Sequence, residues 1–173
     1  MESKFNFKNF SIVIPIFNEE EILEESTNAI FSLCKRMEID FEIIFSENGS
    51  TDKTKVIAEE LTNRHPEIKI ISNPEPNYGN ALKTGFKIAK NDLVISFDID
   101  YYSESFLSEA LKLESEYSGI TASKRLGSSE DGRRFIRRLA TNFFVILLKT
   151  LFGTKLSDTH GMKAIKKSEI EKF

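Results

Sequence analysis

The stretch SIVIPI, residues 11–16, decides the fold. It is almost continuously apolar and rich in β-branched residues, which is typical of a strand buried on both faces of a parallel sheet. Pro15 lacks a backbone donor and marks the end of this strand. Asn18 is a candidate cap for the next helix, with residues 19–21 in its first turn, where negative charge suits the helix dipole. The stretch therefore predicts a strand that leads directly into a helix.

The same alternation continues along the chain. Further strands are expected at residues 41–46, 68–72, 93–97 and 119–123, with helical spacing of apolar residues between them. These connections are too long for hairpins and favour crossover helices between parallel strands. The sequence predicts an α/β fold, a mostly parallel sheet flanked by helices on both faces.

Composition and charge limit the function classes. With 173 residues, 40% hydrophobic and 29% charged, the chain is expected to form one globular domain. A net charge of −3 gives no reason to expect nucleic-acid binding. The charge is uneven, because residues 1–60 carry 6 Lys and Arg against 13 Asp and Glu, whereas residues 121–173 carry 12 against 5. This gradient suggests that the basic end handles something anionic, although a solvated charged surface is the simpler alternative.

The surroundings of the chain also follow from its sequence. Cys34 is the only cysteine, so no intramolecular disulfide is possible, and a buried thiol in a reducing compartment is expected. The first ten residues lack the pattern of a signal peptide. Residues 143–148 form the longest mostly apolar run, well short of the ~20 residues that cross a bilayer. We therefore expect a soluble or peripheral protein in the cytoplasm.

Acidic residues follow three of the expected strands, namely Glu19, Glu47, and the pair Asp98 and Asp100. Ligands of open parallel sheets bind beyond the carboxyl ends of the strands, and a divalent metal relieves repulsion between clustered carboxylates. Two aspartates at this spacing suit Mg²⁺ or Mn²⁺, with substrate phosphates as the remaining ligands. Aspartates that cap a turn, or the helix expected from Ser103, would give the same pattern.

Several segments resemble the motifs of one known family, and they occur along the chain in the same order as in that family. Residues 11–20, 47–54 and 77–85 resemble the V-I-P-x-Y-N-E-E, D-D-G-S-x-D-x-T and N-x-G segments of family 2 glycosyltransferases of the GT-A fold, and Asp98-Ile99-Asp100 resembles their D-x-D. Residues 158–165 are similar to the D-x-x-x-G-F segment of the branch that includes dolichyl-phosphate mannose synthase and polyprenyl-phosphate glycosyltransferases. The resemblance covers nearly the whole chain and implies a GT-A fold that is truncated at its C-terminal side.

The resemblance implies a nucleotide-sugar site and a metal. By position, base and ribose would contact Pro15, Phe17 and Glu19, with Glu47 as an acceptor for the base. The implied donor site also includes Ser50, Lys83 and Ile99, with Asp98 and Asp100 as ligands of Mg²⁺ or Mn²⁺ and Asp100 and Asp158 as catalytic residues. Two departures leave the nucleotide open between UDP and GDP: Glu47-Asn48 replaces the usual Asp-Asp, and Phe17 replaces Tyr. Tyr102 stands where this branch often has Gln.

The resemblance also implies an acceptor side. Lys124 and Arg125 fall at an S-R pair of the branch, and Arg133, Arg134, Arg137 and Arg138 fall in its arginine-bearing segment, where guanidinium groups suit a phosphate. Residues 143–152 would then meet lipid, or simply form core. On this basis residues 1–124 form the nucleotide-binding half and residues 125–173 the acceptor-side segment of one domain.

The implied function is metal-dependent, inverting transfer of a hexose from a nucleoside-diphosphate sugar to a polyprenyl phosphate, by a protein at the cytoplasmic face of a membrane. Two alternatives remain open at this point. One is transfer to a sugar or protein hydroxyl, which needs a general base. The other is a nucleotide-sugar-binding domain that is inactive because it is truncated.

Overall fold

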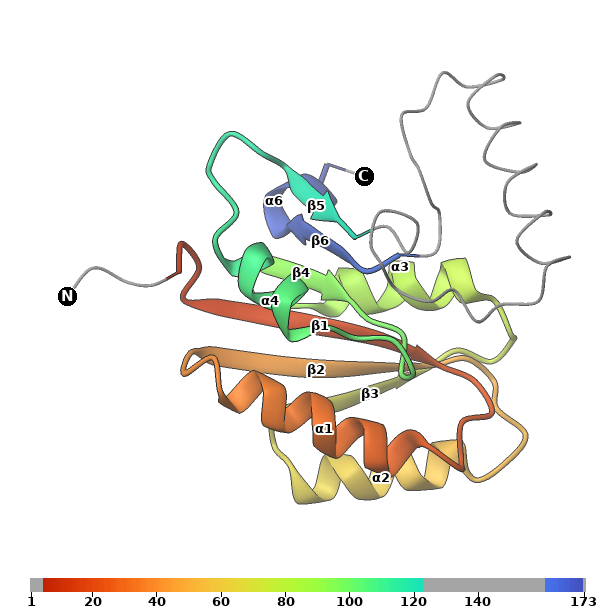
Figure 1. The fold of residues 1–173 in the computed structure, drawn as a ribbon. Coiled ribbons are helices and arrows are strands. Elements are labelled where there is room, and N and C mark those ends of the chain that lie inside the picture. Colours follow the sequence, from red (N-terminus) through yellow and green to blue (C-terminus); the bar gives the residue numbers. More distant parts are fainter. Residues whose placement is uncertain (1–4, 123–160, 173) are drawn as a thin grey trace, which may run out of the picture. The chain divides into compact units, whose positions relative to one another are not determined.

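The computed structural model of the chain describes residues 5–122 and 161–172 (Figure 1). A compact unit, Met1–Ile120 with Met162–Phe173, carries the sheet, and a second unit comprises Thr121–Gly161. The strands are β1 (Asn9–Ile16), β2 (Asp40–Glu47), β3 (Ile68–Ser72), β4 (Leu93–Ser96), β5 (Gly119–Thr121) and β6 (Lys163–Lys166). The helices are α1 (Leu23–Lys35), α2 (Thr54–Arg64), α3 (Tyr78–Ile88), α4 (Glu104–Leu111) and α6 (Lys167–Ile170).

Within the described residues the strands form one sheet in the order β3-β2-β1-β4-β6-β5. The pairs β1–β2, β1–β4 and β2–β3 are parallel, and β6 runs antiparallel to β4. The central strand β1 pairs Ile12 with Ile43 on one side and with Ile95 on the other, and all three side chains are fully buried. The predicted mostly parallel α/β sheet is therefore confirmed.

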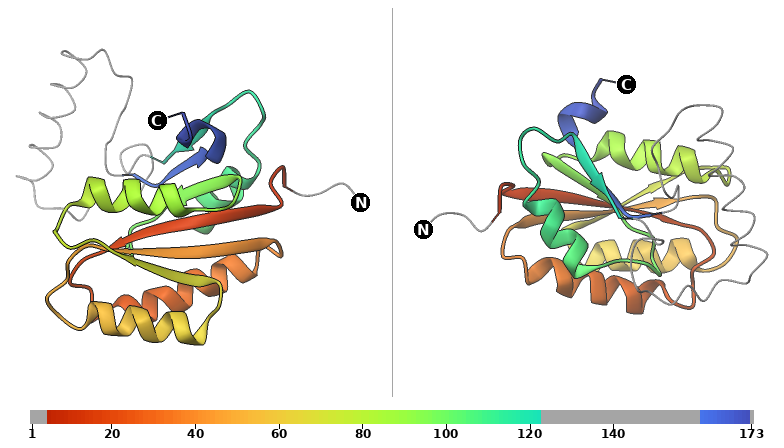
Figure 2. Two further views of the ribbon diagram at one scale, coloured as in Figure 1. Left: turned by 180° about the vertical axis from the view of Figure 1, so that it is seen from behind. Right: turned by 45° about the horizontal axis from the view of Figure 1, so that its top comes forward.

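Helices cover both faces of the sheet, as predicted. Figure 2 shows α3 on the face opposite to α1 and α2. The chain runs from β1 to β3 in one direction and then crosses back to β4, and right-handed crossovers place α3 on the other face for that reason. On the α3 side, Val13, Ile44 and Val94 form an apolar cluster with Ala89. α3 lies so close to β1 that a Cβ added at Gly85 would clash with Cγ1 of Val13.

The loop after β1 differs from the expectation. α1 begins at Leu23, and the residue before it, Ile22, makes no side-chain cap hydrogen bond. Asn18 has a left-handed backbone, with φ of 54°, and its side chain accepts a hydrogen bond from the backbone N–H of Thr51 at 2.9 Å. The prediction that Asn18 caps the helix is wrong, because its side chain is engaged by a loop 33 residues further along the chain.

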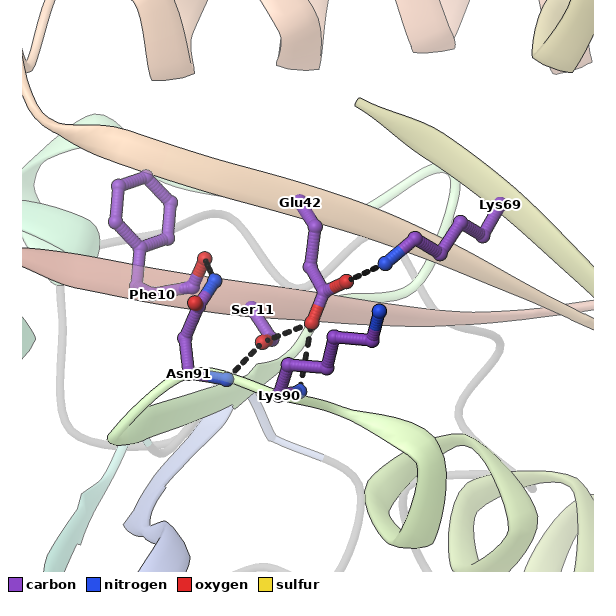
Figure 3. Close-up of polar contacts among 6 residues, drawn as sticks. All are labelled: Phe10, Ser11, Glu42, Lys69, Lys90 and Asn91. Carbon is purple, nitrogen blue, oxygen red and sulfur yellow. Dashed lines mark hydrogen bonds and ion pairs between the residues drawn. The ribbon is translucent and has the colours of Figure 1, made fainter. Parts of the chain in front are cut away.

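A buried carboxylate ties three strands and a loop together at the amino ends of β1 and β2 (Figure 3). The side chain of Glu42 accepts hydrogen bonds from the Ser11 hydroxyl at 2.8 Å and from the backbone N–H of Lys90 at 2.7 Å, and Lys69 forms an ion pair with it. Asn91 donates to the backbone oxygen of Phe10 at 2.7 Å. Burial alone would raise the pKa of Glu42, but these donors outweigh it and hold the pKa below the usual range.

The expectation of a buried thiol is confirmed. Cys34 is fully buried in α1, and burial raises its pKa to about 12, so the thiol stays protonated at neutral pH. Among the described residues, no helix has the length and apolar character needed to cross a bilayer.

Candidate nucleotide-sugar site

A hollow of about 260 Å³ lies beyond the carboxyl ends of β1 and β4. Side chains from the end of β1, the turn after β2, the first turn of α3 and the segment after β4 surround it. Its lining residues are Pro15, Ile16, Phe17, Glu19, Asn48, Tyr78, Asp98, Ile99 and Asp100. The hollow therefore stands where open parallel sheets bind their ligands.

A tight turn presents the two aspartates. Asp98 and Tyr101 exchange backbone hydrogen bonds, 3.3 Å from the Asp98 N–H and 3.1 Å from the Tyr101 N–H. Phe97, before the first aspartate, and Ile99, between the two, are buried and anchor the segment that carries the aspartates. Ser103 caps α4, because its hydroxyl accepts the Phe106 N–H at 3.3 Å. The alternative in which the aspartates cap this helix is therefore wrong.

Negative charge accumulates around the hollow. The pKa of Glu19 lies above its usual value, first because the side chain is partly buried and then because of the charges of Asp100, Asp52 and Asp98. A cation bound between these groups would remove the repulsion. Among the described residues, no three His, Cys, Asp or Glu side chains lie so that they could hold a metal ion by themselves. The donor set fits a Mg²⁺ or Mn²⁺ ion that takes one or two carboxylates and completes its shell with substrate phosphates and water.

The loops after β1 and β2 are laced together by hydrogen bonds from backbone to side chain. The N–H of Asn18 donates to the Ser50 hydroxyl at 3.1 Å, that of Glu19 to the Thr54 hydroxyl at 2.7 Å, and that of Glu20 to the Asp52 carboxylate at 3.2 Å. These contacts fix the backbone on which Phe17 and Glu19 stand. Polar side chains of residues 50–54 thus hold the loop after β1 in place.

The turn after β2 separates two neighbouring polar residues. Glu47 is buried and its carboxylate accepts the Ser50 N–H at 2.6 Å, within its own turn. Asn48 lines the hollow, and its side-chain oxygen accepts the Asn77 N–H at 2.7 Å, next to the start of α3. The role of Glu47 as an acceptor for the base stays a prediction, and Asn48 is a lining residue that the sequence analysis missed.

Tyr78 is the second residue missed. It is the first residue of α3, its ring lines the hollow, and its hydroxyl donates to Oδ1 of Asp98 at 3.0 Å. Burial, the charge of Asp98 and this hydrogen bond raise the pKa of Tyr78. Its place directly after the N-cap Asn77, in the first turn of a helix that follows a strand, is the signal that would have marked it.

The structure brings part of the predicted donor site together. The predicted residues that share the hollow are Pro15, Phe17, Glu19, Asp98, Ile99 and Asp100. Glu47 and Ser50 lie in the adjacent turn, and Lys83 lies within α3, so these three do not line it. The predicted acceptor-side residues lie outside the described residues: Lys124, Arg125, Arg133, Arg134, Arg137, Arg138 and Asp158.

The family follows from a direct comparison. The model of the family described as "Glycosyl transferase family 2" matches residues 11–173. The chain belongs to glycosyl transferase family 2. Among relatives of this family-2 domain, an undecaprenyl-phosphate 4-deoxy-4-formamido-L-arabinose transferase of Pseudomonas fluorescens is 30% identical over 86% of the chain and 44% of the relative. The protein of the same name from Proteus mirabilis is 37% identical over 52% of the chain and 28% of the relative. The family-2 domain thus spans less than half the length of these relatives.

Solved structures support the same fold. A mannosyltransferase from Pyrobaculum calidifontis, solved with GDP-Man and Mn²⁺, matches 94% of the chain and 46% of that structure with a TM-score of 0.64 and 19% identity. Glucosyl-3-phosphoglycerate synthase from Mycobacterium tuberculosis, solved with Mn²⁺, UDP and phosphoglyceric acid, matches 93% of the chain and 56% of that structure with a TM-score of 0.67 and 22% identity. The predicted GT-A fold of this family-2 domain is confirmed.

Proposed function

We propose that this family-2 domain transfers a hexose from UDP-hexose or GDP-hexose to a polyprenyl phosphate, with inversion at the anomeric carbon. The observation that carries the proposal is the pairing of Asp98 and Asp100 with Phe17 and Glu19 around one hollow at the carboxyl ends of β1 and β4. Carboxylates suit ribose hydroxyls and a diphosphate-bound cation, and an exposed aromatic ring suits a base. Relatives named as undecaprenyl-phosphate transferases support the acceptor.

Each part of the donor has candidate partners in this proposal. Pro15 and Phe17 contact the base, Glu19 accepts from the ribose hydroxyls, and Asp98 and Asp100 hold a Mg²⁺ or Mn²⁺ ion. When bound, this ion neutralises the charge that develops on the departing nucleoside diphosphate. The further residues proposed for the donor site are Glu47, Ser50, Lys83 and Ile99.

The acceptor step balances without a strong base. An oxygen of the polyprenyl phosphate attacks the anomeric carbon as the bond to the diphosphate oxygen breaks, and the nucleoside diphosphate leaves. Because the phosphate is already ionised, it needs little help from a general base, and Asp158 orients it. The proposed phosphate partners are Lys124, Arg125, Arg137 and Arg138. The domain then works peripherally at the cytoplasmic face of a membrane, with residues 1–124 on the donor side and 125–173 on the acceptor side.

The test uses the full chain with radiolabelled UDP-hexoses and GDP-hexoses, with and without undecaprenyl phosphate in detergent, in Mn²⁺ or in EDTA. We expect transfer to the lipid that requires the cation, and a product of inverted anomeric configuration. Asp98→Asn and Asp100→Asn should each reduce transfer at least 100-fold, an effect on the order of 3 kcal/mol in the transition state. Unchanged Mn²⁺-dependent nucleotide binding and transfer in both variants would overturn the proposal.

A second function has one observation in its favour. Among the described residues, the predicted site residues that line the hollow all belong to the donor side, which is consistent with a domain that binds a nucleotide sugar without transferring it. In the same experiment, Mn²⁺-dependent binding of a nucleoside-diphosphate hexose without transfer to lipid would favour this function. Transfer to an added sugar or peptide hydroxyl would instead favour the hydroxyl acceptor.

A further inference from the structure

The two aspartates of the hollow are held in different ways. Oδ1 of Asp98 accepts a hydrogen bond from the Tyr78 hydroxyl at 3.0 Å. For Asp100, no hydrogen bond or ion pair of the carboxylate occurs within residues 5–122 and 161–172. One candidate metal ligand is therefore oriented by a neighbour, whereas the other depends on its backbone turn alone.

Tyr78 stands on a fixed base. The N–H of Asn77, the N-cap of α3, donates to Asn48 at 2.7 Å, and the Asn77 side chain accepts the Asn80 N–H at 3.0 Å. One turn further on, the buried Ser46 hydroxyl donates to the Ala81 backbone oxygen at 2.7 Å. These contacts fix the first turn of α3 against the end of β2, so the phenol reaches Asp98 from a defined position.

The hydrogen bond has a direct chemical consequence for Asp98. A carboxylate at the end of a strand rotates about its side-chain torsions, and the phenol O–H selects one orientation by binding Oδ1. The phenol takes up one lone pair of Oδ1 and leaves the carboxylate negatively charged, as a ligand of Mg²⁺ or Mn²⁺ must be. Metal ligands are commonly held by such outer partners, whose removal costs metal affinity without removing a ligand.

We propose that Tyr78 is a positioning residue that holds the Asp98 carboxylate in the orientation that receives the cation of the nucleotide-sugar complex. The proposal rests on the proposed function, since it needs Asp98 as a ligand. It gives a role to the first turn of α3, beside the segments after β1, β2 and β4 that also line the hollow. Tyr78 acts through Asp98 and does not itself take part in the reaction.

The test measures Mn²⁺ binding by the full chain, from the electron paramagnetic resonance signal of the free ion, in the presence of UDP or GDP. In Tyr78→Phe, which keeps the ring and removes the hydroxyl, we expect the dissociation constant for Mn²⁺ to rise about 10-fold. Nucleotide binding in EDTA should not change. Tyr117→Phe is the matched control, because Tyr117 is a similarly exposed tyrosine that does not line the hollow, and it should bind Mn²⁺ as the wild type does.

A double-mutant cycle separates positioning from general damage. The effect of Tyr78→Phe should disappear in an Asp98→Asn background and persist in an Asp100→Asn background. Unchanged or tighter Mn²⁺ binding by Tyr78→Phe would overturn the positioning role, as would a loss seen only in Tyr78→Leu, which would assign the effect to the ring. If the wild type fails to bind Mn²⁺ both in the presence of UDP and in the presence of GDP, the proposed function itself is contradicted. That outcome is distinct from a wild type that binds Mn²⁺ and a Tyr78→Phe variant that binds it equally well.

Discussion

At the scale of a single residue, Glu19 shows how charge repulsion around the hollow affects the stability of the metal-free chain. Its raised pKa means that the folded state disfavours the ionised carboxylate, so Glu19 lowers stability at neutral pH. Glu19→Gln should therefore raise the free energy of unfolding of the metal-free chain at pH 7, by on the order of 0.5 kcal/mol after solvent screening. The gain should shrink as the pH falls and Glu19 takes up a proton.

Denaturant titrations at pH 7 and pH 5 measure this difference. Glu21→Gln is the control, since Glu21 is an exposed acidic neighbour that does not line the hollow, and it should leave stability unchanged. A Glu19→Gln variant less stable than the wild type at pH 7 would contradict the expected repulsion.

Glu42 is the opposite case, because its donors make the ionised form the favoured one. The lowered pKa means that its stabilisation is complete above about 4.5, the ordinary value of the unfolded chain, and is lost as the pH falls through the lower folded value. Glu42→Gln should lower the free energy of unfolding at pH 7 by about 1–3 kcal/mol, because buried partners lose a charged acceptor. The difference in unfolding free energy between the variant and the wild type should shrink as the pH falls below this range.

Glu67→Gln provides the comparison for Glu42. Glu67 forms an ion pair with Lys35 at 2.7 Å, but the Lys35 side chain is 54% exposed, so the loss should stay below about 1 kcal/mol. Equal losses in the two variants, measured by denaturant titration, would show that burial adds nothing to the Glu42 network.

At the scale of an element, α3 depends on the closeness of its approach to β1. Gly85→Ala places a methyl group against the fully buried Val13 and should cost about 1–3 kcal/mol of unfolding free energy. Gly79→Ala, in the same helix, has only the Asn77 side chain nearby, at 3.6 Å, and should be neutral or stabilising. In a Val13→Ala background, Gly85→Ala should cost less unfolding free energy than it does in the wild type. An equal cost in both backgrounds would place the strain elsewhere.

The elements themselves were largely predictable from local pattern. Buried strands are marked by β-branched runs, and the expected strand at 68–72 coincides with β3. The helix expected from Ser103 is also present as α4, and Ser103 caps it, because a serine before an apolar helix satisfies a free N–H wherever the helix packs. Such features depend on neighbours in sequence.

The contacts of the site depend on neighbours in space, which the sequence pattern does not carry. Asn18 has the composition of a helix cap, yet it pairs with Thr51 in another loop. The place of Tyr78 at the start of a helix after a strand marks it as near the site, but only the fold shows that its hydroxyl reaches Asp98, 20 residues away. For the same reason the neighbouring Glu47 and Asn48 separate into a turn and the hollow.

At the scale of the whole molecule, charge is divided along the chain. Residues 121–173 carry 12 Lys and Arg against 5 Asp and Glu. If this segment meets an anionic acceptor at a membrane, the chain should float with vesicles containing anionic phospholipid and not with phosphatidylcholine alone. Binding should be lost at about 0.5 M salt, where screening acts within a few ångströms.

Replacing Arg137 and Arg138 by Gln should reduce this vesicle binding several-fold. In the matched control, Gln replaces Lys55 and Lys87, which are two exposed lysines from the acidic part of the chain. This variant should bind vesicles as the wild type does. An equal reduction in both double variants would assign binding to overall charge and remove the support for a dedicated acceptor segment.

The hydrogen bonds that lace the loops after β1 and β2 have a consequence for engineering. Most of these bonds join a backbone N–H of one loop to a side chain of the other, as in the pairs Glu19–Thr54 and Lys53–Glu20. If only one of the two loops were replaced by that of a relative, its side chains would no longer match the hydrogen-bonding groups of the other loop. A chimera meant to change donor preference must therefore move residues 17–22 and 47–54 as a single cassette.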